Sequence, residues 1–110
     1  MPEPVRDETP IGILYVPIET SASMTLVVGV PGRSILVLDC WFVCSANTNV
    51  KFQTSSGPVD LTGPAYCIQN GGVVLGFSAG GWFATNPSDS LLISLSPGVP
   101  IGGSLAYTLV

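Results

Sequence analysis

The chain has 110 residues, of which three are basic, seven are acidic and none is histidine, so its formal net charge is -4. Charged residues make up 9% of the chain, against about 25% in an ordinary soluble domain. A net negative charge excludes the basic surface that nucleic-acid binding requires. The lack of histidine removes the commonest general base and metal ligand. This length predicts a single domain.

The low charge also bears on how the surface is used. Hydrophobic residues make up 46% of the sequence. A free monomer usually relies on charge for hydration and mutual repulsion. We therefore expect part of the surface to be covered in an oligomer or a larger assembly. A compact monomer coated with serine, threonine and asparagine is the alternative.

The first ten residues differ from the rest of the chain. They hold prolines at positions 2, 4 and 10 and four of the ten charges, on Glu3, Arg6, Asp7 and Glu8. Proline favours an extended, polyproline-like segment. The segment has neither the basic nor the apolar region of a secretory signal, so we expect no signal peptide. We expect residues 1–10 to form an extended arm ordered against a neighbour; a frayed terminus is the alternative.

From residue 11 onward the chain reads as strand after strand. Apolar or alternating runs separated by Gly, Pro, Asn or Ser turns are typical of short β-strands. The expected strands are residues 11–18, 24–30, 34–44, 49–54, 58–61, 66–68, 73–77, 82–84, 91–95 and 105–109. No run has the apolar spacing of a helix. The pattern predicts an all-β fold, a single-domain sandwich or jelly roll of about eight strands over residues 11–110.

The longest run, residues 34–44, is apolar on both faces except at Asp39. Strict alternation puts Ile35 and Val37 on the same face as Trp41. Such a strand is central and covered on both sides, or it lies at an interface. The run is too short for a membrane-spanning helix, which needs about 20 apolar residues.

Asp39 needs a partner if this strand is buried, because an unpaired carboxylate is costly away from water. The candidate partners are Arg33, Lys51 and Arg6. We expect a structural ion pair or hydrogen bonds to a loop backbone. An ion pair between subunits, with Arg33 or Arg6 coming from a neighbour, is the alternative.

No set of residues predicts an enzyme. Residues 76–80 match G-x-S-x-G, but that motif needs a strand-to-helix turn and a histidine downstream. Asp60 and Asp89 lie beside turns, where aspartate commonly accepts hydrogen bonds from backbone N–H groups. The three cysteines fall short of a zinc site, and we expect them to be buried thiols. We therefore expect no catalytic residue, metal or cofactor.

Some aromatic residues suit a partner surface. Trp82 and Phe83 are adjacent, so on a strand one of the two rings points away from the core. Trp41 and Tyr107 are expected to fill the core instead. The candidate interface residues are Arg6, Asp7, Glu8, Arg33, Asp39, Trp82 and Phe83.

The turns and core positions of the second half follow a recognisable order. Residues 50–64 read VKFQTSSGPVDLTGP, residues 71–77 GGVVLGF, residues 81–85 GWFAT, residues 89–95 DSLLISL and residues 102–107 GGSLAY. Over about residues 34–110 the chain resembles the small jelly-roll, tumour-necrosis-factor-like proteins of tailed bacteriophages, especially capsid decoration (cement) proteins.

This resemblance implies a non-enzymatic virion protein. In that group three copies commonly meet around a threefold axis and clamp capsid subunits, often with an extended terminal arm. The implied partners are the chain itself, as a homotrimer, and the major capsid protein, with no nucleic acid and no membrane. The implied location is the outer capsid surface, after folding in the host cytoplasm. A receptor- or carbohydrate-binding module of a phage tail fibre or spike is the alternative.

Overall fold

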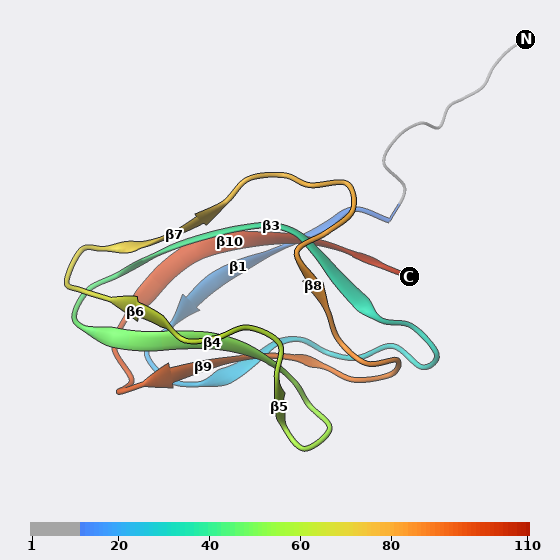
Figure 1. Cartoon of the computed structure of the whole chain (residues 1–110), viewed down its shortest axis with the longest axis horizontal. Coiled ribbons are helices and arrows are strands. Elements are labelled where there is room, and N and C mark those ends of the chain that lie inside the picture. Colours follow the sequence, from blue (N-terminus) through green and yellow to red (C-terminus); the bar gives the residue numbers. More distant parts are fainter. Residues whose placement is uncertain (1–11) are drawn as a thin grey trace, which may run out of the picture.

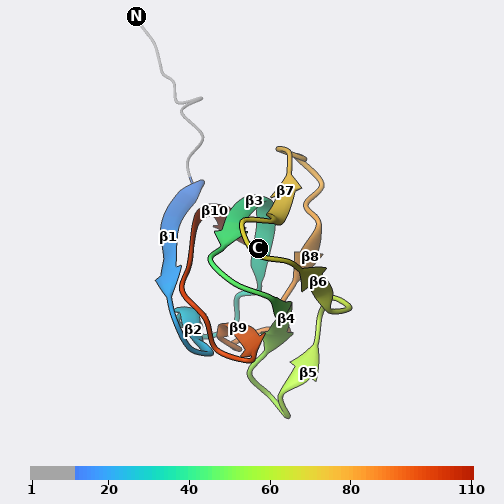
Figure 2. The ribbon, with the colours of Figure 1, turned by 90° about the vertical axis from the view of Figure 1, so that its left-hand side faces the viewer.

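The computed structural model describes residues 12–110, which form two antiparallel sheets packed face to face (Figure 1, Figure 2). Sheet A contains, in spatial order, β1 (Leu14–Thr20), β10 (Ile101–Leu109), β3 (Ile35–Cys44) and β7 (Gly72–Leu75), and β8 (Phe83–Ala84) also pairs with β3. Sheet B contains β2 (Met24–Val27), β9 (Leu91–Ser96), β4 (Thr48–Thr54) and β5 (Val59–Asp60), and β6 (Ala65–Cys67) also pairs with β4. The described residues form no helix, so the all-β sandwich expected from the sequence is confirmed.

The strands pair as one long hairpin folded back on itself. The first strand pairs with the last, β1 with β10, and the second pairs with the last but one, β2 with β9. Further in, β3 pairs with β7 and β8, and β4 pairs with β5 and β6. This nested order is the topology of an eight-stranded jelly roll. The fold has ten strands instead of eight because two strands of the jelly roll are each divided in two. Residues 61–64 separate β5 from β6, and residues 76–82 separate β7 from β8.

Three phenylalanine rings connect the two sheets in the core. The ring centroid of Phe52, on β4, lies 6.4 Å from that of Phe42, on β3, and 5.1 Å from that of Phe83, on β8. Val50 is also buried on β4, so the inward positions expected for this alternating strand are correct. Removing apolar surface from water at this interface is the main force that holds the sheets together.

A β-bulge interrupts the alternation of β3. Along β10 the register passes from Ala106 opposite Asp39 to Tyr107 opposite Val37, which leaves Leu38 as an extra residue on β3. An extra residue bends the strand and moves every later side chain to the other face. The odd-numbered residues of β3 therefore face the core before the bulge, and the even-numbered residues face it after the bulge.

The bulge corrects two expectations from the sequence. Ile35 and Val37 are buried on one side of it, and Phe42 is buried on the other. Trp41 does not share their face and is not a core residue: its side chain is 48% exposed on the outside of sheet A. Tyr107, the other aromatic residue expected inside, does pack against the core.

Candidate functional site

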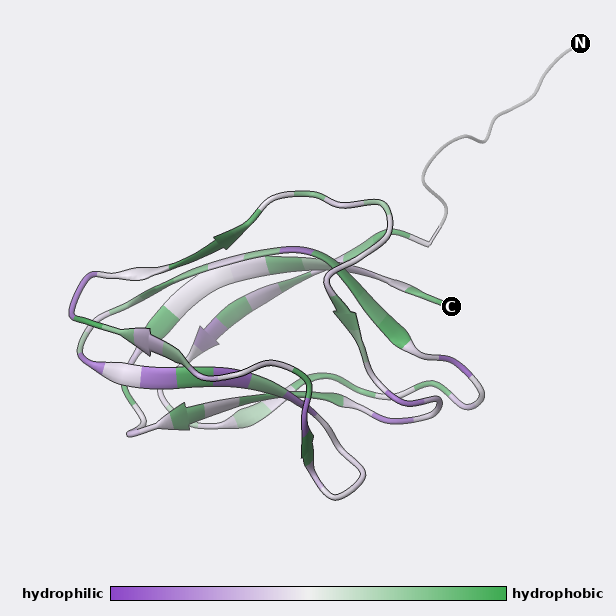
Figure 3. Ribbon diagram, in the orientation of Figure 1, coloured by the Kyte–Doolittle hydropathy of each residue, from purple (hydrophilic) through white to green (hydrophobic). Residues whose placement is uncertain are grey.

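The two sheets present different chemistry to solvent. On sheet B the outward side chains of the central strands are mostly polar, and Figure 3 shows hydrophilic bands along β4. On sheet A the outward positions are largely apolar, and β7 is strongly hydrophobic in the same view. A sandwich that used both sheets only to enclose its core would need polar residues on both outer faces.

Cross-strand register assembles the apolar positions of sheet A into rows. One row of directly opposed residues crosses four strands: Pro17, Ser104, Trp41 and Val74. Opposed residues of antiparallel strands share a face. Val74 is 80% exposed, and Val43 is exposed in the next row. We call the outward side chains of β1, β10, β3 and β7, together with Phe77 in the loop after β7, the sheet A face.

A groove of about 340 Å³ lies on the sheet A face. Three aromatic rings line it, those of Tyr15, Trp41 and Phe77, and Asp39 and Ser104 supply polar groups. All three aromatic side chains are exposed. Aromatic residues gathered in one outward patch are typical of surfaces that bind a partner.

Trp82 and Phe83 point in opposite directions, as expected from their adjacency. The Trp82 ring is exposed and its Nε1–H donates a hydrogen bond of 2.8 Å to the carbonyl of Gly76, which lines the groove. Phe83 instead packs against Phe52 between the sheets. Trp82 is therefore the residue of this pair available to a partner, and Phe83 is a core residue.

A wider groove of about 600 Å³ runs beside β1 and β10, and Gly102 forms part of its floor. A Cβ added to Gly102 would come no nearer than 3.9 Å to another atom, the carbonyl oxygen of Ile18. A Cβ on the neighbouring Gly103 would collide with the carbonyl oxygen of Trp41. The fold thus requires glycine at 103 but not at 102. A strand glycine without an internal reason is typical of a place where another molecule approaches closely.

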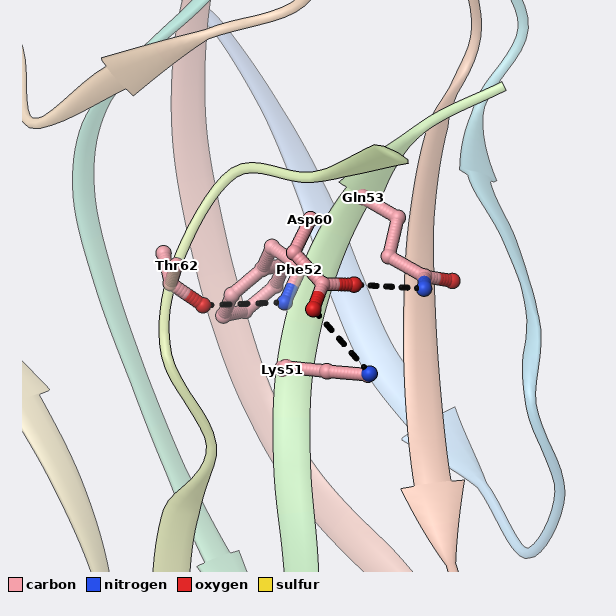
Figure 4. Close-up of polar contacts among 5 residues, drawn as sticks. All are labelled: Lys51, Phe52, Gln53, Asp60 and Thr62. Atoms are coloured by element: carbon pink, nitrogen blue, oxygen red, sulfur yellow. Dashed lines mark hydrogen bonds and ion pairs between the residues drawn. The ribbon is translucent and has the colours of Figure 1, made fainter. Parts of the chain in front are cut away.

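Asp39 is half-buried on the sheet A face, beside the groove. Lys51, one of the three candidate partners of Asp39, does not pair with it, because Lys51 lies on sheet B with its Nζ 3.2 Å from Oδ2 of Asp60 (Figure 4). Arg33 is exposed in the turn before β3. Within residues 12–110 no side chain forms an ion pair with Asp39. Arg6 is outside the described residues, so the structure does not test that pairing.

Asp89 links two loops that are far apart in the sequence. Its carboxylate accepts hydrogen bonds from Thr54 Oγ1 (2.6 Å), Ser56 Oγ (2.6 Å) and the Ser56 N–H (3.1 Å). These bonds, that of the Ser56 hydroxyl foremost, lower the pKa of Asp89. The turn role expected for Asp89 is confirmed. Asp60 instead binds side chains of the adjacent strand β4.

The cysteines are free, buried thiols, as expected. Burial is the main cause that raises the pKa of Cys40 to about 12, and the negative charge of Asp39 adds to it. Burial, followed by a hydrogen bond with Cys67, raises the pKa of Cys44 to about 11. Both thiols remain protonated at neutral pH, which is the unreactive form.

The motif at residues 76–80 lies in the loop between β7 and β8, where Ser78 N–H donates to the carbonyl of Leu38. The strand-to-helix turn of a nucleophile elbow is not formed there. Among residues 12–110 no group of three or more Cys, Asp or Glu side chains is placed to hold a metal ion. The same residues contain no helix long and apolar enough to cross a membrane.

Sequence reasoning missed the exposed residues of the sheet A face, although one signal was present. Asp39 and Trp41 are two positions apart, so they share a face, and a carboxylate favours the outward one. The other candidates, Arg6, Asp7 and Glu8, lie outside the part of the chain that the structure describes. Neither a family model nor a curated protein matches this chain.

Proposed function

We propose that the chain is a non-enzymatic virion structural protein, a capsid decoration (cement) protein that binds the outer surface of a phage capsid as a homotrimer. The observation that supports self-association is the sheet A face, an apolar and aromatic surface on the outside of the sandwich. The assignment to a capsid comes from the resemblance of residues 34–110 to the decoration proteins of tailed phages.

The sheet A face favours contact between copies because its exposed groups gain most when they leave water. Trp41, Val74 and Phe77 are 48%, 80% and 62% exposed in the single chain. Burial of apolar surface is the dominant favourable term in most protein association. Aromatic residues placed at the centre of an interface usually carry a large share of the binding energy.

The low charge of the chain supports the same proposal. The chain has only three basic and seven acidic residues, and the outward rows of β1, β10, β3 and β7 contain only Glu19 and Asp39 as charged groups. Few charges would have to be desolvated when this face is covered, so that cost of association is small.

The proposed role is mechanical. Each trimer would bridge neighbouring shell subunits and add buried area that resists the pressure of the packaged DNA. The arm expected at residues 1–10 would extend this contact across the shell. No step of this role needs a nucleophile, a metal or a cofactor.

The capsid role is tested by co-sedimentation of the purified chain with undecorated capsids of the corresponding phage. We expect binding to saturate at a multiple of three copies per local threefold axis. Removal of residues 1–10 should weaken binding while the domain stays folded. Lack of binding, or only a few copies per particle, would contradict a decoration role.

A further inference from the structure

Sheet B carries a groove of its own, of about 270 Å³, on the side of the molecule opposite the sheet A face. Its lining residues are Asn49, Lys51, Pro64, Tyr66, Ser94 and Ser96. Register places them side by side: Asn49 lies opposite both Tyr66 and Ser96, and Lys51 lies opposite Ser94. The volume is slightly below the lower limit, about 300 Å³, of pockets that bind drug-sized molecules.

Tyr66 is the unusual member of this groove. Its side chain is 78% exposed, more than that of any other aromatic residue in residues 12–110. Its hydroxyl makes no hydrogen bond with another described residue, and its ring lies outside the core. The fold therefore gains little from this ring. An amphipathic ring held in water beside polar groups is suited to a ligand with one apolar face.

The polar side of the groove is ordered by a network on β4 and β5. Asp60 accepts a hydrogen bond of 3.2 Å from Lys51 Nζ and one of 2.8 Å from Gln53 Nε2 (Figure 4). The hydrogen bond that Phe52 N–H donates to Thr62 Oγ1 holds the return from β5 against β4 (Figure 4). The carboxylate both orients the Lys51 ammonium and neutralises its charge.

We propose that this groove binds a neutral pyranose sugar. The Tyr66 ring would pack against the apolar face of the sugar ring. The Asn49 amide, the hydroxyls of Ser94 and Ser96 and the Lys51 ammonium offer donors and acceptors for its hydroxyl groups. A neutral sugar is favoured over an acidic one because Asp60 already balances the charge of Lys51.

This inference is independent of the proposed capsid role, since the groove and the sheet A face lie on different sheets. The two grooves also differ in chemistry. The sheet A groove is lined by several apolar side chains, as a protein partner requires, whereas the sheet B groove has one aromatic ring and one proline among amide, hydroxyl and ammonium groups. Sugar binding could therefore fail while assembly stands, and the reverse.

The test is a titration of the full-length ¹⁵N-labelled chain, followed by the shifts of its backbone amide signals. The probes are maltose, N,N′-diacetylchitobiose and digalacturonic acid at millimolar concentration. We expect both neutral disaccharides to shift the signals of Asn49, Lys51, Tyr66 and Ser94. Tyr66→Ala should weaken this binding at least about tenfold, and Tyr66→Phe, which keeps the ring, should retain it.

Val28→Ala is the control, because Val28 is 75% exposed and lines neither of the two grooves. It should bind the sugars as the wild-type chain does, and the amide spectrum of each variant checks that it is folded. The proposal is overturned if neither neutral probe shifts these signals, or if the shifts fall on the sheet A face. A response to digalacturonic acid alone would also overturn it, since the contact would then be with the Lys51 charge.

Discussion

Asp89 has the densest set of side-chain hydrogen bonds in the described part of the chain. It is buried, and it joins the end of β4 to the loop before β9 through Thr54 and Ser56. Thr54 Oγ1 in turn accepts the N–H of Asn86, so the carboxylate organises both loops. These bonds favour the charged form, which is why the folded state lowers the pKa of Asp89.

A lowered pKa makes the contribution of Asp89 to stability depend on pH. The bonded carboxylate stabilises the fold above its unfolded pKa, about 3.9, and this stabilisation is lost as the pH falls through the lower folded value. We expect Asp89→Asn to lower the melting temperature at neutral pH and to reduce its decline in acid. Thermal unfolding between about pH 7 and pH 3 measures both effects.

Asp39→Asn is the control for this prediction, because the Asp39 carboxylate is half-buried and accepts none of these hydrogen bonds within residues 12–110. At neutral pH its melting temperature should fall by less than that of Asp89→Asn. An Asp89→Asn chain with the wild-type dependence would show that the network does not stabilise the fold.

At the scale of the strand, β10 contains two adjacent glycines with opposite requirements. Gly103 faces the core, where a Cβ would meet the backbone of β3, and Gly102 faces open space. We expect Gly103→Ala to destabilise the fold by about 1–3 kcal/mol through overpacking. Gly102→Ala should leave stability unchanged or raise it by about 0.5–1 kcal/mol, because alanine is better tolerated than glycine in a strand.

Urea unfolding of the two variants measures the difference. Equal losses of stability would mean that the fold itself requires glycine at position 102. Gly102 would then give no reason to expect another molecule close to the floor of the wide groove. If Gly102→Ala keeps its stability but weakens self-association, the flat floor serves a partner.

Regular strands were predictable from the sequence, and irregular ones were not. Val50 and Phe52 alternate with polar residues, so β4 and its buried face follow from the pattern. The bulge in β3 does not, because the extra residue, Leu38, is apolar among apolar neighbours. β10 begins at Ile101, earlier than expected, since glycines usually weaken a strand and here pair with β1 and β3.

The candidate site was harder to predict than the fold, for a physical reason. The groove of the sheet A face joins Tyr15, Trp41 and Phe77, which come from distant parts of the chain. Only the jelly-roll pairing brings them together. The outward orientation of Trp41 also depends on the bulge, so alternation alone placed it inside.

At the scale of the whole molecule, the sandwich has one polar outer face and one apolar outer face. The side chains of the polar face can form hydrogen bonds with water, and this face contains the groove proposed for a sugar. The apolar face is unfavourably exposed to water, and the free energy falls when another surface covers it. Because the chain has so few charges and such a face, we propose that it is a subunit whose copies make contact through the sheet A face.

Sedimentation equilibrium of the purified chain tests this claim most directly, with two variants that each replace one exposed valine. Val74 lies on the sheet A face and Val59 lies on β5 of sheet B. We expect the wild-type chain and Val59→Ser to sediment at three times the chain mass of 11.4 kDa, and Val74→Ser to dissociate toward the monomer. A wild-type monomer, or a Val74→Ser trimer as stable as the wild type, would contradict the claim.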